Sequence, residues 1–256
     1  MTYRQLNAQQ TIETLQTLKN RIGERFDGTS LERVADELCT IAGESRAKIE
    51  WIDRPHRGLR VAVFGVVLIA LAVLWFGINE LVKSHTEAFT FSDAITLIES
   101  GINEIIFAGA ALAFLFSLEV RVKRTRALRA LHDLRAVAHV IDMHQLTKDP
   151  SQILNADARP TKSSPKRVLT PFQLTRYLDY CSEMLSLIGK LAALYAQSLP
   201  DPVVVAAVND IETLTNGLSR KIWQKIVMLD DIARVIAASP KSDEKTSVEP
   251  QGDETL

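Results

Sequence analysis

The pattern of apolar positions divides the chain into an apolar centre and flanks in which apolar residues recur every three or four positions. Residues 61–78 read VAVFGVVLIALAVLWFGI and carry no charge. As a helix this segment would be about 27 Å long, close to the thickness of the hydrocarbon core of a bilayer. Few helices of soluble proteins are apolar on all sides over this length, so we interpret the segment as a transmembrane helix.

A second apolar segment, Ile105 to Leu118, is shorter. Extended to 102–121 it reaches a spanning length, with Glu119 placed four residues before Lys123 as a favourable helical ion pair. A single span would leave this second segment exposed to water. The two segments together therefore predict a two-span transmembrane hairpin.

Basic residues predict the orientation of this hairpin. The connecting loop contains Lys83 alone, whereas five basic residues flank each outer end: Arg46, Lys48, Arg54, Arg57 and Arg60 before the first span, and Arg121, Lys123, Arg124, Arg126 and Arg129 after the second. The positive-inside rule then places both termini in the cytoplasm. The first apolar run begins sixty residues into the chain and is too long for a cleaved signal core, so we expect a multi-pass protein of a cell membrane, with a bacterial inner membrane as the best fit.

Helical periodicity continues on both sides of the hairpin. Residues 8–26 form an amphipathic pattern, and Thr29 with Glu32 predicts a capping box at the start of the next helix. No glycine or proline interrupts the chain from Leu118 to about Leu146, which predicts that the second span continues as a rigid cytosolic helix.

The region 170–238 predicts an antiparallel coiled-coil hairpin. Its two helices are separated by Pro200 and Pro202, and apolar residues alternate in steps of four and three along both. Lys225 interrupts this pattern, and a polar residue there sets the register or marks the place where another chain packs. The predicted coiled-coil seam consists of Leu174, Leu178, Leu185, Ile188, Ile211, Leu218, Ile222 and Leu229.

These patterns predict an all-α membrane protein, a fold class that the few glycines and prolines also favour. The predicted parts are a cytosolic N-terminal helical hairpin (1–58), the first transmembrane helix (59–83), a short external loop (84–101), the second transmembrane helix (102–121), a cytosolic helical extension (122–147), a linker (148–169), the coiled-coil hairpin (170–238) and a disordered tail (239–256). Within the loop, the spacing of Ile95, Ile98 and Ile102 has three interpretations: a short amphipathic helix along the outer surface, a helix that runs into the second span, or a plain surface connection.

Composition excludes several classes of protein. The formal charge of −1 averages basic flanks with an acidic tail, and we expect no nucleic-acid partner. Cys39 and Cys181 both fall on apolar stripes, which indicates small core residues in a reducing compartment. Four basic residues in the linker have two interpretations, contact with an anionic leaflet or simple solvation.

Two features of the second span have more than one interpretation. Gly109, Ala113 and Ser117 share one face, which packs either against the first span or against a second copy of the chain. Glu104 is either an interfacial, solvated acid at the membrane edge or part of an ion path.

Signatures of an enzyme are missing from the sequence. No phosphate-binding glycine loop, G-x-S-x-G or H-E-x-x-H motif is present, so we expect no enzyme, cofactor or metal. His139 and Asp142 stand one turn apart near His132, but Arg135 lies between the two histidines, which favours a polar helix edge over a metal site.

Two functions are compatible with this architecture. The first is a membrane-anchored interaction or scaffold protein, whose partners are the lipid bilayer and either a second copy or a helical protein that binds open seams. The second is an oligomeric pore or ion-flux effector, which needs several subunits because two spans cannot enclose a water path.

Overall fold

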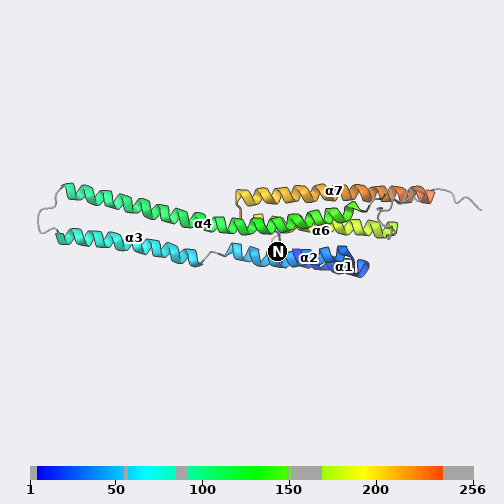
Figure 1. The fold of residues 1–256 in the computed structure, drawn as a ribbon, viewed down its shortest axis with the longest axis horizontal. Helices are drawn as coiled ribbons and strands as arrows, with labels where there is room; N and C mark the ends of the chain where they lie inside the picture. The colour runs from blue at the N-terminus through cyan, green and yellow to red at the C-terminus, as the bar shows by residue number, and fades with distance from the viewer. Residues whose placement is uncertain (1–4, 55–56, 85–90, 149, 151–168, 239–256) are drawn as a thin grey trace, which may run out of the picture.

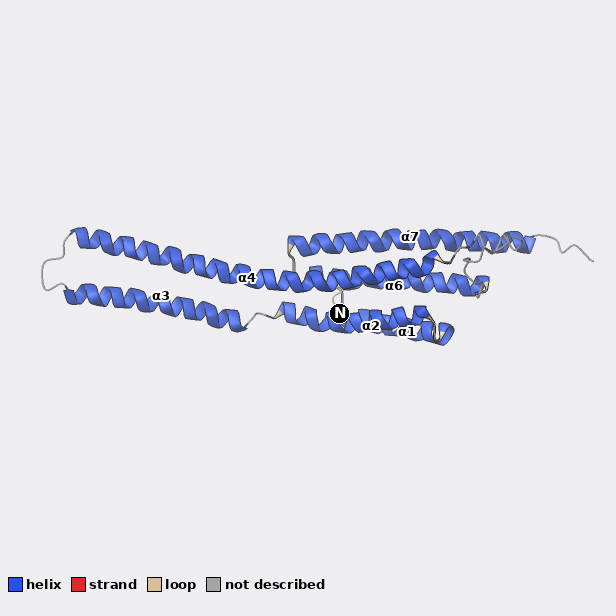
Figure 2. Cartoon of the chain, in the orientation of Figure 1, coloured by secondary structure: helices blue, strands red, loops and turns tan. Residues whose placement is uncertain are grey.

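The computed structural model describes residues 5–54, 57–84, 91–148, 150 and 169–238. Within these ranges the chain forms six α-helices and no strand (Figure 2), which confirms the all-helical prediction for the described residues. The molecule is elongated, with two helices side by side at one end and the others gathered at the opposite end (Figure 1). The predicted linker and tail lie almost entirely outside the described residues.

Helices α1 (Ala8–Phe26) and α2 (Ser30–Asp53) form a hairpin with a short turn. Gly28 in this turn has a φ of 69°, a left-handed conformation that glycine adopts without strain. The Thr29 hydroxyl accepts the N–H of Glu32 at 3.5 Å, as the predicted capping box requires. The Glu32 carboxylate accepts the N–H of Gly28 at 2.8 Å instead of that of Thr29, so the box closes one residue earlier than predicted.

Helices α3 (Arg57–Ser84) and α4 (Phe91–Leu146) follow. Most of the segment 84–101, predicted as an external loop, belongs to α4 in the structure. Its isoleucines keep the helical spacing up to Ile102 and it contains no proline, so nothing in the segment stops the helix. From Phe91, α4 then continues without a break to Leu146, and it is the longest helix described.

Helices α6 (Pro171–Ser198) and α7 (Pro202–Ala238) complete the fold, each with a well-formed N-terminus. At α6, Thr170 and Gln173 exchange side chain–backbone hydrogen bonds of 2.9 and 3.2 Å, which together form a full capping box. At α7, the Asp201 carboxylate accepts the N–H groups of the second and third helical residues at 3.0 and 3.3 Å.

Five helical segments pack into one unit, which we call the bundle: α1, α2, residues 121–146 of α4, α6 and α7. Arg124 of α4 contacts Asp201 at the start of α7, and Gln145 near the end of α4 contacts Lys225 further along α7. The two helices therefore run parallel, and α6 returns antiparallel to both (Figure 1).

All eight predicted seam residues are buried in this bundle, with exposed fractions of 0–6%. They belong to a core that also contains side chains of α1, α2 and α4, such as Leu15, Leu38 and Leu134. The expectation that the seams stay open for a partner was therefore wrong. A pair of helices alone would leave apolar surface in water, and the chain covers that surface with its own other helices.

Candidate functional site

The apolar hairpin, by which we mean α3 and residues 91–120 of α4, exposes its apolar side chains. Both helices contain a segment long and apolar enough to cross a membrane, and 0% of either segment is buried. Phe64, Trp75 and Phe107 are 67–75% exposed. The core helix of a soluble protein can have the same composition but is buried, so this exposure favours contact with lipid.

Small side chains form much of the contact between α3 and α4. Half-buried positions recur along both helices every three or four residues, as expected for two packed helices. Small residues at such positions allow the two backbones to approach closely. These positions include Ala62, Val66 and Ala70 on α3 and Gly101, Glu104, Ala108, Ala111 and Leu115 on α4.

The small-residue face, defined by Gly109, Ala113 and Ser117, lies elsewhere. All three residues are exposed, and a Cβ atom added at Gly109 would meet no heavy atom within 4 Å beyond its chain neighbours and the nearby backbone of its own helix. Ala113 is nine residues, or two and a half helical turns, from Glu104, which places it on the opposite side of α4. Within one chain, therefore, α3 packs on α4 without using the small-residue face.

Glu104 lies on the side of α4 that packs on α3. The residue is half-buried, and its Oε1 atom is buried without a hydrogen-bond partner among the described residues. Glu104 is thirteen residues from the start of α4, and Leu71 is thirteen residues from the end of α3. Because antiparallel helices pair at about equal distances from their connection, Glu104 lies at a level of α4 that faces the apolar segment Val61–Asn79 of α3.

Charged residues of α4 find partners where the helix enters the bundle. Lys123 forms an ion pair of 2.9 Å with Glu119, and both are largely buried. The Arg126 guanidinium lies 3.8 Å from the centre of the Trp51 ring, which ties the end of α2 to α4. The first contact lies within α4, and the second joins α4 to α2.

Asp201 connects α4 to α7 near the place where α4 enters the bundle. Arg124 donates from Nη2 and Nε to the Oδ2 atom of Asp201 at 2.6 and 3.0 Å, while Oδ1 caps α7. The bond to Arg124 lowers the pKa of the buried Asp201 carboxyl, and the backbone N–H groups of α7 lower it further. One carboxylate thus starts α7 and attaches it to α4.

Lys225 makes a second connection, near the other end of the bundle part of α4. Its Nζ donates to the backbone oxygen of Gln145 at 2.8 Å and to the Gln145 side chain at 2.7 Å. The last carbonyls of a helix have no intrahelical donor and carry partial negative charge, so a cation is favourable there. The Lys225 that interrupts the predicted seam therefore binds the end of α4 in the same chain.

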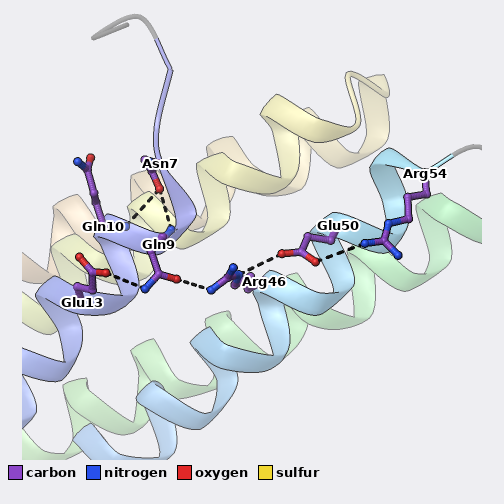
Figure 3. A network of polar contacts seen from close by, with 7 residues as sticks. All are labelled: Asn7, Gln9, Gln10, Glu13, Arg46, Glu50 and Arg54. Atoms are coloured by element: carbon purple, nitrogen blue, oxygen red, sulfur yellow. Dashed lines mark hydrogen bonds and ion pairs between the residues drawn. The ribbon is translucent and has the colours of Figure 1, made fainter. Parts of the chain in front are cut away.

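A polar network connects α1 and α2 on the bundle surface (Figure 3). Arg46 donates to Gln9 from one nitrogen and to Glu50 from another at 3.0 Å, and Gln9 donates to Glu13 at 2.7 Å. The residues of this network are exposed, and Arg54 joins it more loosely, at 3.8 Å from Glu50. Exposed ion pairs of this kind stabilise a fold only slightly.

The remaining candidates show no reactive arrangement. His132 and His139 are exposed, and no group of three or more His, Cys, Asp or Glu among the described residues is placed to hold a metal ion. Burial lowers the pKa of His144 and raises that of the Cys181 thiol to about 12. A buried thiol with so high a pKa is not nucleophilic at neutral pH.

No protein-family model, curated protein or solved structure matches this chain. Inferences about function therefore rest on its own geometry. The contact between Arg124 and Asp201 was not predicted from the sequence. An acidic cap just before α7 and a basic residue just after an apolar span were the available signals, but nothing in the sequence pairs residues 77 positions apart.

Proposed function

We propose that this chain is a membrane-anchored helical interaction protein, with the apolar hairpin crossing a bacterial inner membrane twice and the bundle lying at its cytoplasmic face. The observation that carries the proposal is the contrast in exposure within one chain. The bundle buries most of its large apolar side chains in a common core, whereas the apolar hairpin exposes them along both helices. Lipid is the environment in which such exposure costs nothing.

The orientation is tested by cysteine accessibility in intact cells. A membrane-impermeant maleimide should label Ser92→Cys, next to the connection between the spans, without lysis. Thr213→Cys, an exposed position of α7, should be labelled only after lysis. Labelling of Thr213→Cys in intact cells would contradict the proposed topology, and release of the protein from membranes by alkaline carbonate would contradict membrane insertion.

We propose a second copy of the chain as the first partner. The small-residue face points away from α3, so it is available to another α4 in the membrane. Gly109→Leu should shift the subunit count of the detergent-released protein, measured by native mass spectrometry, towards the monomer. Gly77→Leu is the matched control, because Gly77 is also exposed in the apolar hairpin with open space around it. A monomeric parent protein would contradict self-association.

A test for a protein partner of the bundle needs a surface substitution, because substitutions in the seam would unfold it. Aspartate at Leu185 or Ile222 would disrupt a core in which both side chains are 0% exposed, so lost binding would report only unfolding. Trp223 is 63% exposed on α7, and exposed tryptophans are frequent binding hot spots. Trp223→Ala should therefore reduce recovery of a protein partner while leaving the bundle folded.

The geometry gives less support to the ion-flux alternative. A ring of chains joined through the small-residue face would place Glu104 on the opposite side of α4, between α3 and α4 of each chain. The acid would then not line a path at the contact between subunits. A defined ring of five or more subunits with ion flux in liposomes, abolished by Glu104→Gln, would favour this alternative over the scaffold.

A further inference from the structure

A groove on α4 lies at the level where the apolar hairpin meets the bundle. Its volume is about 580 Å³, and it is lined by Phe116, Ser117, Val120, Arg121 and Arg124. The two apolar residues lie towards the hairpin, and the two arginines lie towards the bundle. All five fall within nine residues, so the groove is about 12 Å long along the helix.

The charges around this groove are not equally compensated. Lys123, on another side of α4, is paired with Glu119, and Arg124 is held by Asp201. Arg121 is exposed and has no acidic partner among the described residues. The groove therefore has an uncompensated positive charge at one end, and the exposed Phe116 and Val120 at the other.

We propose that this groove binds one anionic phospholipid of the inner leaflet, with the phosphate at Arg121 and Arg124 and an acyl chain along Phe116 and Val120. The inference rests on the proposed membrane insertion, and it applies to an α4 whose Ser117 is not covered by a second copy, because Ser117 belongs both to this groove and to the small-residue face. Phe116 and Val120 are four positions apart, and Arg121 and Arg124 follow three positions apart, so the apolar and basic parts come in the order of a lipid's tail and headgroup. A soluble anion would use the arginines but would leave the apolar part empty.

The bond between Arg124 and Asp201 gives the site its geometry. The Asp201 carboxylate holds the Arg124 side chain in place, so that this guanidinium is positioned before a lipid arrives. Arg121 supplies the charge that attracts the phosphate. Binding at this place would attach the lipid next to the start of α7, and so would connect the lipid composition of the leaflet to the part of the bundle nearest the membrane.

Native mass spectrometry of the full-length protein in mixed micelles containing equal phosphatidylglycerol and phosphatidylcholine tests the proposal. The parent should retain one phosphatidylglycerol in preference to phosphatidylcholine, and Arg121→Gln should lower this preference about fivefold, the value of one basic residue near an anionic surface. Arg129→Gln, which removes an exposed charge two turns further along α4 and outside the groove, should retain the parental preference.

Two further measurements separate a lipid site from a plain anion site and from an effect of the substitution itself. A photoactivatable phosphatidylglycerol should crosslink the unmodified protein within residues 116–124, which tests the site without any substitution. Glycerol phosphate has the headgroup without acyl chains, and equal competition by it would overturn a lipid site in favour of a plain anion site. If the protein stays in carbonate-washed membranes but retains both lipids equally, this inference alone is overturned. If the protein is released from those membranes, the proposed function is overturned.

Discussion

The two parts of α4, residues 91–120 in the apolar hairpin and residues 121–146 in the bundle, can be compared within a single helix. In the first part, large apolar side chains such as Ile105, Phe107 and Phe114 point outwards and are strongly exposed. In the second part, apolar residues such as Leu131 and Leu134 occupy one stripe and are buried by other helices. The helix itself does not change, because it has no break between Phe91 and Leu146. What changes is whether other helices of the chain cover its apolar side chains.

Under the proposed membrane insertion, the two parts gain stability from different sources. The first part is suited to lipid, where an intact helix satisfies its own backbone groups and tight packing needs small side chains. The second part depends on burial of a stripe by partner helices in water. Substitutions of the same type should therefore have different effects in the two parts, and the following predictions use this contrast.

The largest effect is expected from shortening a buried leucine. Leu134→Ala, at a side chain that is 0% exposed, should lower the free energy of unfolding of the bundle by about 2–5 kcal/mol, because it removes apolar contacts and leaves a cavity. Leu118→Ala, in the same helix at 45% exposure, should change it by less than about 1 kcal/mol. Urea unfolding in mild detergent, followed by circular dichroism, measures both. Equal losses would show that the two parts of α4 are stabilised in the same way.

A smaller loss is expected at the contact between Lys225 and Gln145. Lys225→Met keeps most of the side-chain length but leaves the buried Gln145 side chain without its cationic donor, which should cost about 1–3 kcal/mol. Lys221→Met is the control, since Lys221 is exposed one turn earlier on α7. The same unfolding assay applies, and a control as damaging as Lys225→Met would refute a specific role for this contact.

Acid should weaken the connection between α4 and α7. The pKa of Asp201 is lower in the folded protein than in the unfolded chain, so its contribution is complete above the unfolded value of about 4 and is lost as the pH falls below it. Asp201→Asn keeps a good cap but loses the charge, and should remove about 1 kcal/mol at neutral pH and reduce the acid dependence of stability. Unfolding measured from pH 7 down to about pH 3 checks this. Asp210→Asn, an exposed substitution on α7, is the control.

The smallest effect is expected in the surface network of Figure 3. Arg46→Ala should cost no more than about 1 kcal/mol, because its partners Gln9 and Glu50 are exposed. High salt should shrink the difference from the parent further, since mobile ions screen exposed charges. A loss that persists in high salt would show that Arg46 contributes by packing its aliphatic part against the bundle.

Sequence patterns predicted the helices well because each depends on neighbours in the chain. The start of α2 was located from Thr29 and Glu32, and α4 continues to Leu146 because no glycine or proline interrupts it after Leu118. The start of α4 was placed too late, because the polar residues between Phe91 and Gly101 resemble a loop although their helical spacing is intact.

Side-chain environments were predicted less well. The positions of Glu104 and Lys225 depend on α3 and on the end of α4, respectively, and such contacts join residues that are distant in the chain. The same holds for the coiled-coil seam, which a heptad pattern assigns to two helices although its core also contains side chains of α1, α2 and α4. Periodicity identifies the apolar side of a helix, but it does not identify the helices that cover this side.

The sequence by itself determined the helical class, the two apolar segments, most helix ends and the excess of basic residues on one side, since these are properties of composition and local spacing. Tertiary structure alone decided that the seams are buried, that the small-residue face points away from α3, and that α7 is attached to α4 through Asp201 and Lys225. These outcomes depend on which surfaces meet, because burial and charge pairing are set by distance in space and not by distance along the chain.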